Sequence, residues 1–301
     1  MFLAKVMLVA GILATTLLTS PNAAAEPLGG SAPPKFDPPK RYYLALGDSV
    51  AYGYQQSKVD AGLPPSAFDT GYVDVFAARL RLIRPGLTVV DYGCPQESTA
   101  SFILGPCPQN ARGFPLHDAF SGSQLRAATA FLRRHPGQVS PITLSLGGQD
   151  ISDFTDSCGG DFTCIENGAP AEIGTMAASF RVILARLRAA APDAEIIITG
   201  AWDGNIGYFA EADPLFQALN TALTAAASSE RARFADTFAV FNPQADPTAE
   251  TNAICALTLL CTEGDGHPSD AGYAAIAGAV FDASGYARLG HRRSRASGKR
   301  P

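Results

Sequence analysis

The chain has 301 residues, of which 47% are hydrophobic and 17% are charged, with a mean hydropathy of +0.07. At about 150 residues per domain this length allows one large domain or two small ones, and the apolar fraction suffices for a sizeable core, which excludes a mainly disordered chain. The 23 Lys and Arg residues against 28 Asp and Glu residues give a net charge of -5. Because nucleic-acid binding usually needs a basic surface, we expect no nucleic-acid partner.

The N-terminal residues have the pattern of a secretory signal. Lys5 precedes an uncharged apolar run over residues 6–18, and small residues follow at Ala23, Ala24 and Ala25. This order predicts a signal peptide over 1–25, cleaved near Ala25, and a secreted protein. A retained membrane anchor is the alternative, but the run is short for a membrane span, so we expect no stable membrane insertion.

Both ends of the chain differ in composition from its centre. Residues 26–40 contain five prolines, which predicts a Pro-rich linker, and the fold is expected to begin at Arg41. Residues 288–301 are rich in Arg and Lys and predict a basic disordered tail. The sequence therefore predicts a single folded domain over 41–287.

The six cysteines fall into three groups of two neighbours in the sequence. In an exported chain they should be oxidised, and none has the spacing of a zinc site. Six cysteines allow fifteen pairings. Closeness in sequence favours three local disulfides, which are Cys94–Cys107, Cys158–Cys164 and Cys255–Cys261.

Short apolar runs alternate with helical periodicity from Tyr42 onward. Strands are expected at 42–46, 87–92, 142–146, 195–199 and 234–235, with helices at 71–84, 122–134, 172–191 and 214–229. Such alternation predicts right-handed βαβ units and an α/β fold in three layers, α/β/α, with a central parallel sheet of about five strands. Functional loops should lie at the carboxyl ends of the strands.

Four motifs lie at or beyond these strand ends. Taken alone, Ser49 is as well explained as a helix N-cap, and the glycines as ordinary turn residues. A histidine with a carboxylate two residues earlier has the parts of a general base and its orienting group. The motifs are Gly47-Asp48-Ser49-Val50, Tyr92-Gly93-Cys94-Pro95, Gly147-Gly148-Gln149-Asp150 and Asp265-Gly266-His267-Pro268.

In this order the motifs resemble those of the SGNH (GDSL) hydrolase family, in its secreted bacterial esterase and lipase branch. The resemblance implies the family's flavodoxin-like fold and makes Ser49 the nucleophile, His267 its base and Asp265 the residue that orients the imidazole. It also implies an oxyanion hole formed by the N–H groups of Ser49 and Gly93 and by the side-chain amide at Gln149.

Two positions depart from the family's pattern. Gln149 stands where the family normally has Asn, and its amide is carried on a longer stem. The acid more often precedes the histidine by three residues, where this chain has Gly264, so Asp265 is expected to act either through its side chain or through its backbone carbonyl.

For the remaining candidate residues, the sequence favours structural roles over functional ones. His117 beside Asp118 is expected to be a loop or surface pair, His135 ends a helix, and His291 belongs to the tail. Trp202 lines either the core or an acyl pocket. With four histidines in all, no metal site is expected, and the chemistry needs no cofactor.

The function expected from these observations is a secreted serine esterase or lipase that hydrolyses carboxylic esters through an acyl-enzyme intermediate. Its substrate would be a small-molecule, lipid or acylated-sugar ester, and we expect a monomer. The alternative, motivated by Gln149, is a catalytically impaired secreted protein that binds a ligand or carbohydrate on the same fold. Long loops at 54–70, 94–121 and 152–171 are expected to form the pocket walls.

Overall fold

The computed structural model describes residues 38–243, 246–286 and 289. All of them belong to the unit Phe36–Pro301. The expected signal peptide lies outside the described residues. So do most of the linker and, apart from Leu289, the tail.

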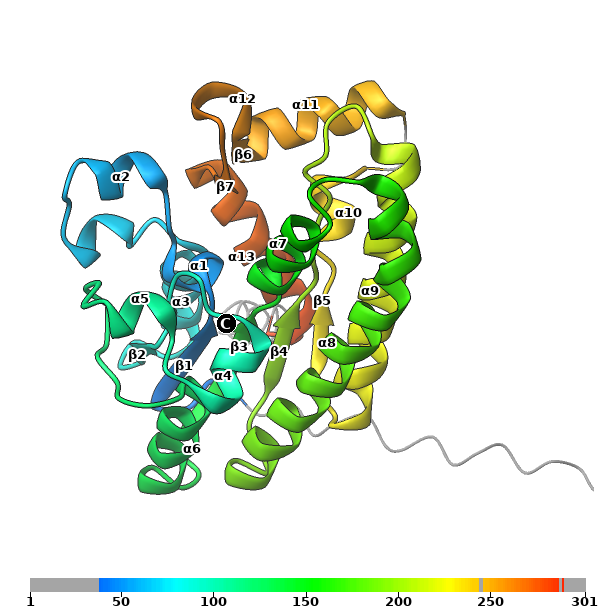
Figure 1. The fold of residues 1–301 in the computed structure, drawn as a ribbon. Coiled ribbons are helices and arrows are strands. Elements are labelled where there is room, and N and C mark those ends of the chain that lie inside the picture. Colours follow the sequence, from blue (N-terminus) through cyan, green and yellow to red (C-terminus); the bar gives the residue numbers. More distant parts are fainter. Residues whose placement is uncertain (1–37, 244–245, 287–288, 290–301) are drawn as a thin grey trace, which may run out of the picture. The chain divides into compact units, whose positions relative to one another are not determined.

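A parallel sheet of five strands forms the centre of the fold (Figure 1). Its strands are β1 (Tyr42–Gly47), β2 (Thr88–Asp91), β3 (Val139–Ser145), β4 (Ile196–Thr199) and β5 (Arg233–Ala235), and they lie in the order β2-β1-β3-β4-β5. All four pairings are parallel. The chain therefore has the expected α/β/α class with five strands, and the strand order reverses between β1 and β3.

Each face of the sheet is covered by helices, because alternate strand residues point to opposite faces and are apolar on both. One face, with Leu44, Ile142 and Ile196, packs against α6 (Gln124–Arg134), α8 (Phe162–Ala190) and α9 (Phe209–Ser229). The other face, with Tyr43 and Ile197, packs against α3 (Tyr72–Ile83) and α13 (Asp270–Ser284).

Shorter elements connect these layers and gather near the carboxyl ends of the strands. They are α1 (Ser49–Tyr52), α2 (Gln56–Asp60), the 3-10 helix η1 (Pro65–Phe68), α4 (Thr99–Leu104), α5 (Pro108–Ala111), α7 (Gly148–Ser157), α10 (Phe238–Phe241), α11 (Pro247–Leu257), β6 (Thr258–Leu259), α12 (Leu260–Glu263) and β7 (Asp265–Pro268). β6 and β7 pair in an antiparallel sheet of their own.

The prediction of a long loop over 152–171 is wrong. α7 extends to Ser157, and α8 begins at Phe162, ten residues earlier than expected. The Asp161 side chain caps α8 by accepting from the N–H groups of Thr163 and Cys164, and Pro170 lies inside the helix. Similarly, α9 begins at Phe209 and contains Pro214, which the sequence analysis had placed at the helix start.

The three disulfides pair cysteines that are close in sequence, as expected: Cys94–Cys107, Cys158–Cys164 and Cys255–Cys261. The first ties the loop after β2 to the start of α5, the second closes the turn between α7 and α8, and the third joins α11 to α12. Within the described part of the chain, no helix has the length and apolarity to cross a membrane.

The end of β1 approaches β3 unusually closely. Gly47 has φ +133°, and a Cβ at this position would lie 1.7 Å from the carbonyl oxygen of Ser145. The buried Gln124 side chain completes the contact, because it accepts from Gly47 N–H at 2.7 Å and donates to Gly47 C=O at 3.0 Å. Only glycine fits here, and the residues that follow are held at a fixed place beside β3.

We expect Gly47→Ala to destabilise the fold by more than about 3 kcal/mol, because the side chain would combine a disfavoured φ with a clash against backbone that cannot move aside. Urea denaturation with the disulfides intact measures the change. Gly86→Ala is the matched control: Gly86 is exposed with nothing near its virtual Cβ, so this variant should stay within about 1 kcal/mol of the unmodified chain. Equal stability of the two variants would contradict the close approach.

Candidate active site

The candidate site lies where the strand order reverses, a position that parallel α/β sheets commonly use for ligands. Ser49 follows β1 and is the first residue of α1, whose N-cap is the preceding Asp48. The Asp48 carboxylate accepts from Val50 N–H at 3.0 Å, so the capping role belongs to Asp48. The Ser49 hydroxyl is thereby left to make other contacts.

Three side chains that the sequence analysis singled out form one chain of hydrogen bonds. The Ser49 Oγ lies 3.0 Å from His267 Nε2, and His267 Nδ1 lies 2.5 Å from Asp265 Oδ1. The serine and histidine are 218 positions apart in sequence, so the fold alone brings them together. A nucleophile in contact with a base, and the base in contact with a third orienting group, is the arrangement that activates a serine.

Asp265 contacts the histidine through its side chain, which answers the question left open by its unusual spacing. Asp265 and His267 are two residues apart on β7, so both side chains lie on one face of the strand. Burial alone would raise the pKa of Asp265. Hydrogen bonds from the His267 ring and from the N–H groups of Gln56 and His267 outweigh it and lower the pKa to about 2.

Tyr54 positions the histidine from the other side and was not found by sequence reasoning. Its ring lies 4.6 Å from the His267 ring, centroid to centroid, and its backbone C=O accepts from the Tyr273 hydroxyl at 2.7 Å. Nothing about a tyrosine just after α1 indicates such a contact, because Tyr54 and His267 are far apart in the sequence.

The expected oxyanion role of Gly93 needs correction. Gly93 N–H donates to Asp91 Oδ1 at 2.7 Å, so it is already engaged. Its lack of a side chain serves packing, because a Cβ would lie 2.5 Å from the Tyr52 backbone nitrogen. Gly93 thus lets the loop after β2 lie directly against α1.

The next turn of the same loop offers a different donor. Glu97 N–H donates to the Cys94 carbonyl at 3.2 Å, with Pro95 and Gln96 between them and φ +63° at Gln96. These are features of a type II turn, in which proline is common at the second position and the third needs positive φ. Gln96 lines the same cavity as Ser49, and its N–H has no hydrogen-bond partner among the described residues.

Gln149 also lines this cavity, near the start of α7. Its side-chain amide donates to Asp153 Oδ1 at 2.7 Å, one helical turn further on. One of the two N–H donors of the amide is engaged in this bond, and backbone N–H groups are further donors at the cavity. Ser49 N–H itself is one of them, because the first turn of a helix leaves its N–H groups without helical partners.

Several buried carboxyl groups surround the site and have raised pKa values. Burial raises the pKa of Asp48, Asp91 and Glu97 to about 7 in each case, against hydrogen bonds that act in the opposite direction. Glu97 accepts from Gln124 Nε2 at 2.9 Å and from the Ser101 hydroxyl at 2.5 Å. Gln124 therefore bridges the end of β1 and the loop that carries Gln96.

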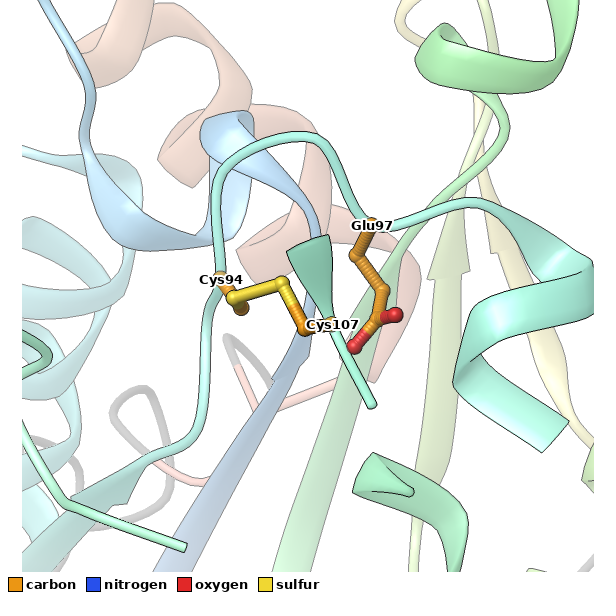
Figure 2. A group of neighbouring side chains, drawn as sticks. All are labelled: Cys94, Glu97 and Cys107. Atoms are coloured by element: carbon orange, nitrogen blue, oxygen red, sulfur yellow. A yellow bond between two sulfur atoms is a disulfide. The ribbon is translucent and has the colours of Figure 1, made fainter. Parts of the chain in front are cut away.

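Figure 2 shows Cys94, Glu97 and Cys107 side by side. Among the described residues, these three form the one group of His, Cys, Asp or Glu side chains close enough together to consider as metal ligands. The two sulfur atoms are bonded to each other, and a cysteine binds metal as its thiolate. The group is a disulfide beside a buried carboxyl, and it braces the loop after β2.

The cavity beside Ser49 and His267 has a volume of about 380 Å³. Trp202 lines it and stacks on Phe241 with ring centroids 4.5 Å apart, so this residue lies between the core and the cavity. His117 and His135 lie elsewhere: His117 contacts the Tyr52 carbonyl, and His135 caps α6. His291 is outside the described residues.

A family model described as the GDSL-like lipase/acylhydrolase family matches residues 45–275. The chain belongs to this family. The resemblance drawn from the four motifs is thereby confirmed at the level of the family, and the chain is a carboxylic ester hydrolase. No curated protein matches the chain.

Solved structures with the same fold include other esterases and lipases, all at low sequence identity. A variant of an acetyl-xylooligosaccharide esterase from Geobacillus stearothermophilus is 18% identical with a TM-score of 0.51, and the match covers 81% of this chain and 94% of that one. The lipase Lip_vut3 from a goat rumen metagenome is 17% identical with a TM-score of 0.55, and the match covers 81% of this chain and 97% of that one. Phospholipase A1 from Streptomyces albidoflavus is 16% identical with a TM-score of 0.54, and the match covers 81% of this chain and 99% of that one. At this identity the likeness supports the fold.

The raised pKa of Asp91 predicts a pH dependence of stability. The unfolded carboxyl ionises near its usual pKa of 3.8 and the folded one near 7, so the folded state binds more protons between these values. Stability should therefore decrease as pH rises from about 4 to about 7. Asp91→Asn keeps an acceptor for Gly93 N–H and removes the ionisation. It should raise the free energy of unfolding at pH 8 by about 1–3 kcal/mol and leave it nearly unchanged at pH 4.

Urea denaturation at the two pH values measures this effect. Asp193→Asn removes an exposed carboxylate instead and should change neither value appreciably. An Asp91→Asn variant that is destabilised at pH 8 would mean that the charged carboxylate, and not its neutral form, stabilises the loop.

Proposed function

We propose that the protein is a secreted serine esterase that forms an acyl-enzyme intermediate on Ser49. The observation that carries the proposal is the unbroken hydrogen-bond chain from Ser49 Oγ through the His267 ring to Asp265. The three disulfides and the signal-like residues 1–25 support the exported location.

In the first half-reaction, His267 Nε2 takes the proton of the Ser49 hydroxyl while Oγ attacks the carbonyl carbon of the ester. The carbonyl oxygen becomes an oxyanion in the resulting tetrahedral intermediate. Asp265, ionised because its pKa is held near 2, stabilises the positive imidazolium and fixes its orientation. When the intermediate collapses, the bond from carbon to the alcohol oxygen breaks, and His267 returns the proton to the departing alcohol.

In the second half-reaction, His267 deprotonates a water molecule that attacks the acyl carbon. The bond to Ser49 Oγ then breaks, the proton returns to Oγ, and the carboxylic acid leaves. In both halves the oxyanion would be stabilised by the N–H groups of Ser49 and Gln96, two backbone donors of residues that line the cavity. Gln96 replaces Gly93 in this assignment.

The alternative of a ligand-binding protein without activity rested on Gln149. The hydrogen bonds among Ser49, His267 and Asp265 are formed without that side chain, so its identity gives no reason to assume a lost activity. The structural relatives include an acetyl-xylooligosaccharide esterase and a phospholipase A1, and ester hydrolysis is what these two activities share.

Ser49→Ala and His267→Ala should each lower kcat for nitrophenyl ester hydrolysis by roughly 10³-fold or more, because nucleophile and base act as a unit. The matched control is Ser152→Ala, since Ser152 lines the same cavity outside the hydrogen-bond chain. Mass spectrometry of the unmodified protein after reaction with an alkyl fluorophosphonate should find one adduct, on Ser49. Near-native turnover by a folded Ser49→Ala variant would refute the assignment.

Gln149→Ala tests how many donors the oxyanion uses. Removing a side-chain donor that contacts the oxyanion typically costs about 10²- to 10³-fold in kcat. Because the Gln149 amide is bonded to Asp153, we expect less than about a tenfold decrease in kcat. A loss of 10²-fold or more, with KM unchanged, would mean that the amide leaves Asp153 and binds the oxyanion during the reaction.

A further inference from the structure

A second cavity of about 440 Å³ lies next to the one that contains Ser49. It is enclosed by α7, α8, α9 and the segment before α9. Its wall is mainly apolar, and the side chains with polar groups are Thr155, Glu172, Asn205 and Tyr208. Much of the apolar surface comes from Phe154, Ile173, Met176, Leu215, Phe216 and Leu219. A volume of this size is in the range of about 300–1,000 Å³ that small-molecule sites occupy.

The two cavities share a wall residue. Ile151, in the first turns of α7, lines both the cavity beside Ser49 and His267 and the apolar one. α7 begins at Gly148, directly after β3, so the helix leads from the catalytic residues to the apolar cavity. The two cavities are therefore neighbours that meet at Ile151.

The walls of the apolar cavity are covalently braced. Cys158–Cys164 closes the turn between α7 and α8, the two helices that carry Phe154 and Ile173. Gly168 on α8 packs against the Phe154 ring so closely that a Cβ at position 168 would lie 2.9 Å from the ring carbons. The cavity is thus built into the packing of these helices, and a ligand would find much of it already formed.

We propose that this cavity binds the acyl chain of the ester substrate and makes the enzyme selective for medium-length or longer acyl groups over acetyl groups. The assignment rests on the proposed function at Ser49. An acyl chain is apolar along its whole length and matches the wall, whereas the alcohol part of a glycerolipid or a sugar ester carries polar groups that would lose their hydration there. The alcohol part is left to the more polar catalytic cavity.

The test varies the acyl chain of nitrophenyl esters from acetyl to decanoyl with the leaving group held constant. For the unmodified protein, kcat/KM should rise with chain length by up to about fourfold per buried methylene, which corresponds to about 0.8 kcal/mol, until the cavity is filled. Ala169 on α8 is buried and lines the cavity. Ala169→Trp should lower kcat/KM for the octanoyl ester at least tenfold and change that for the acetyl ester less than about twofold.

The matched control is Ala178→Trp, the same substitution at an exposed position of the same helix, which should alter neither rate. Ile173→Ser makes the wall polar without adding bulk, and it should lower the octanoyl rate selectively even if Ala169→Trp fails to fold.

Three outcomes would overturn the acyl assignment. One is an unmodified enzyme with equal kcat/KM for acetyl and octanoyl esters. Another is a cavity variant that lowers both rates equally. The third is a cavity variant that lowers kcat/KM for octyl acetate but not for nitrophenyl octanoate, which would mean that the cavity binds the alcohol part of the ester. Absence of hydrolysis with every ester would instead refute the proposed function at Ser49, so the two failures are distinguishable.

Discussion

The backbone of Gly47 lies so close to the Ser145 carbonyl that no side chain fits between them, and this contact fixes the end of β1 against the end of β3. Ser49 follows two residues later on one side, and α7 starts three residues after Ser145 on the other. Gln124 ties both polar groups of Gly47 and the Glu97 carboxyl to one side-chain amide. The position of the serine, the start of α7 and the loop that carries Gln96 therefore depend on a single crowded point of the sheet.

The carboxyl groups near the site differ in their pKa values in a way that suits ester hydrolysis. Asp265 is held ionised by the groups that donate to it, whereas burial raises the pKa of Asp48 and Glu97 to about 7. An ionised carboxylate is useful beside the imidazole, which becomes positive, and harmful beside a forming oxyanion. With pKa values near 7, the carboxyls of Asp48 and Glu97 keep hydrogen bonds in the loops around Ser49 and become mostly neutral below pH 7.

The sequence predicted the parts of the fold that rest on local patterns. Alternating strands and helices predicted the class, and the resemblance of four short motifs to a known family pointed to Ser49 and His267. The helix predicted from residue 172 in fact begins at Phe162, where the Asp161 side chain caps it. Gly93 was predicted as an oxyanion donor from the family resemblance, and only the folded loop reveals that its N–H donates to Asp91. The apolar cavity involves four separate segments and has no local signature.

The two-residue spacing of Asp265 and His267 has a consequence for how the site is assembled. On an extended strand the acid and the base share a face by local geometry, and the distant residues Gln56 and Tyr54 then complete their orientation. Of the two hydrogen bonds in the catalytic chain, only the one to Ser49 spans a long stretch of sequence. The contact between acid and base is thus local to one short strand, whereas the contact with the serine depends on how the whole intervening chain folds.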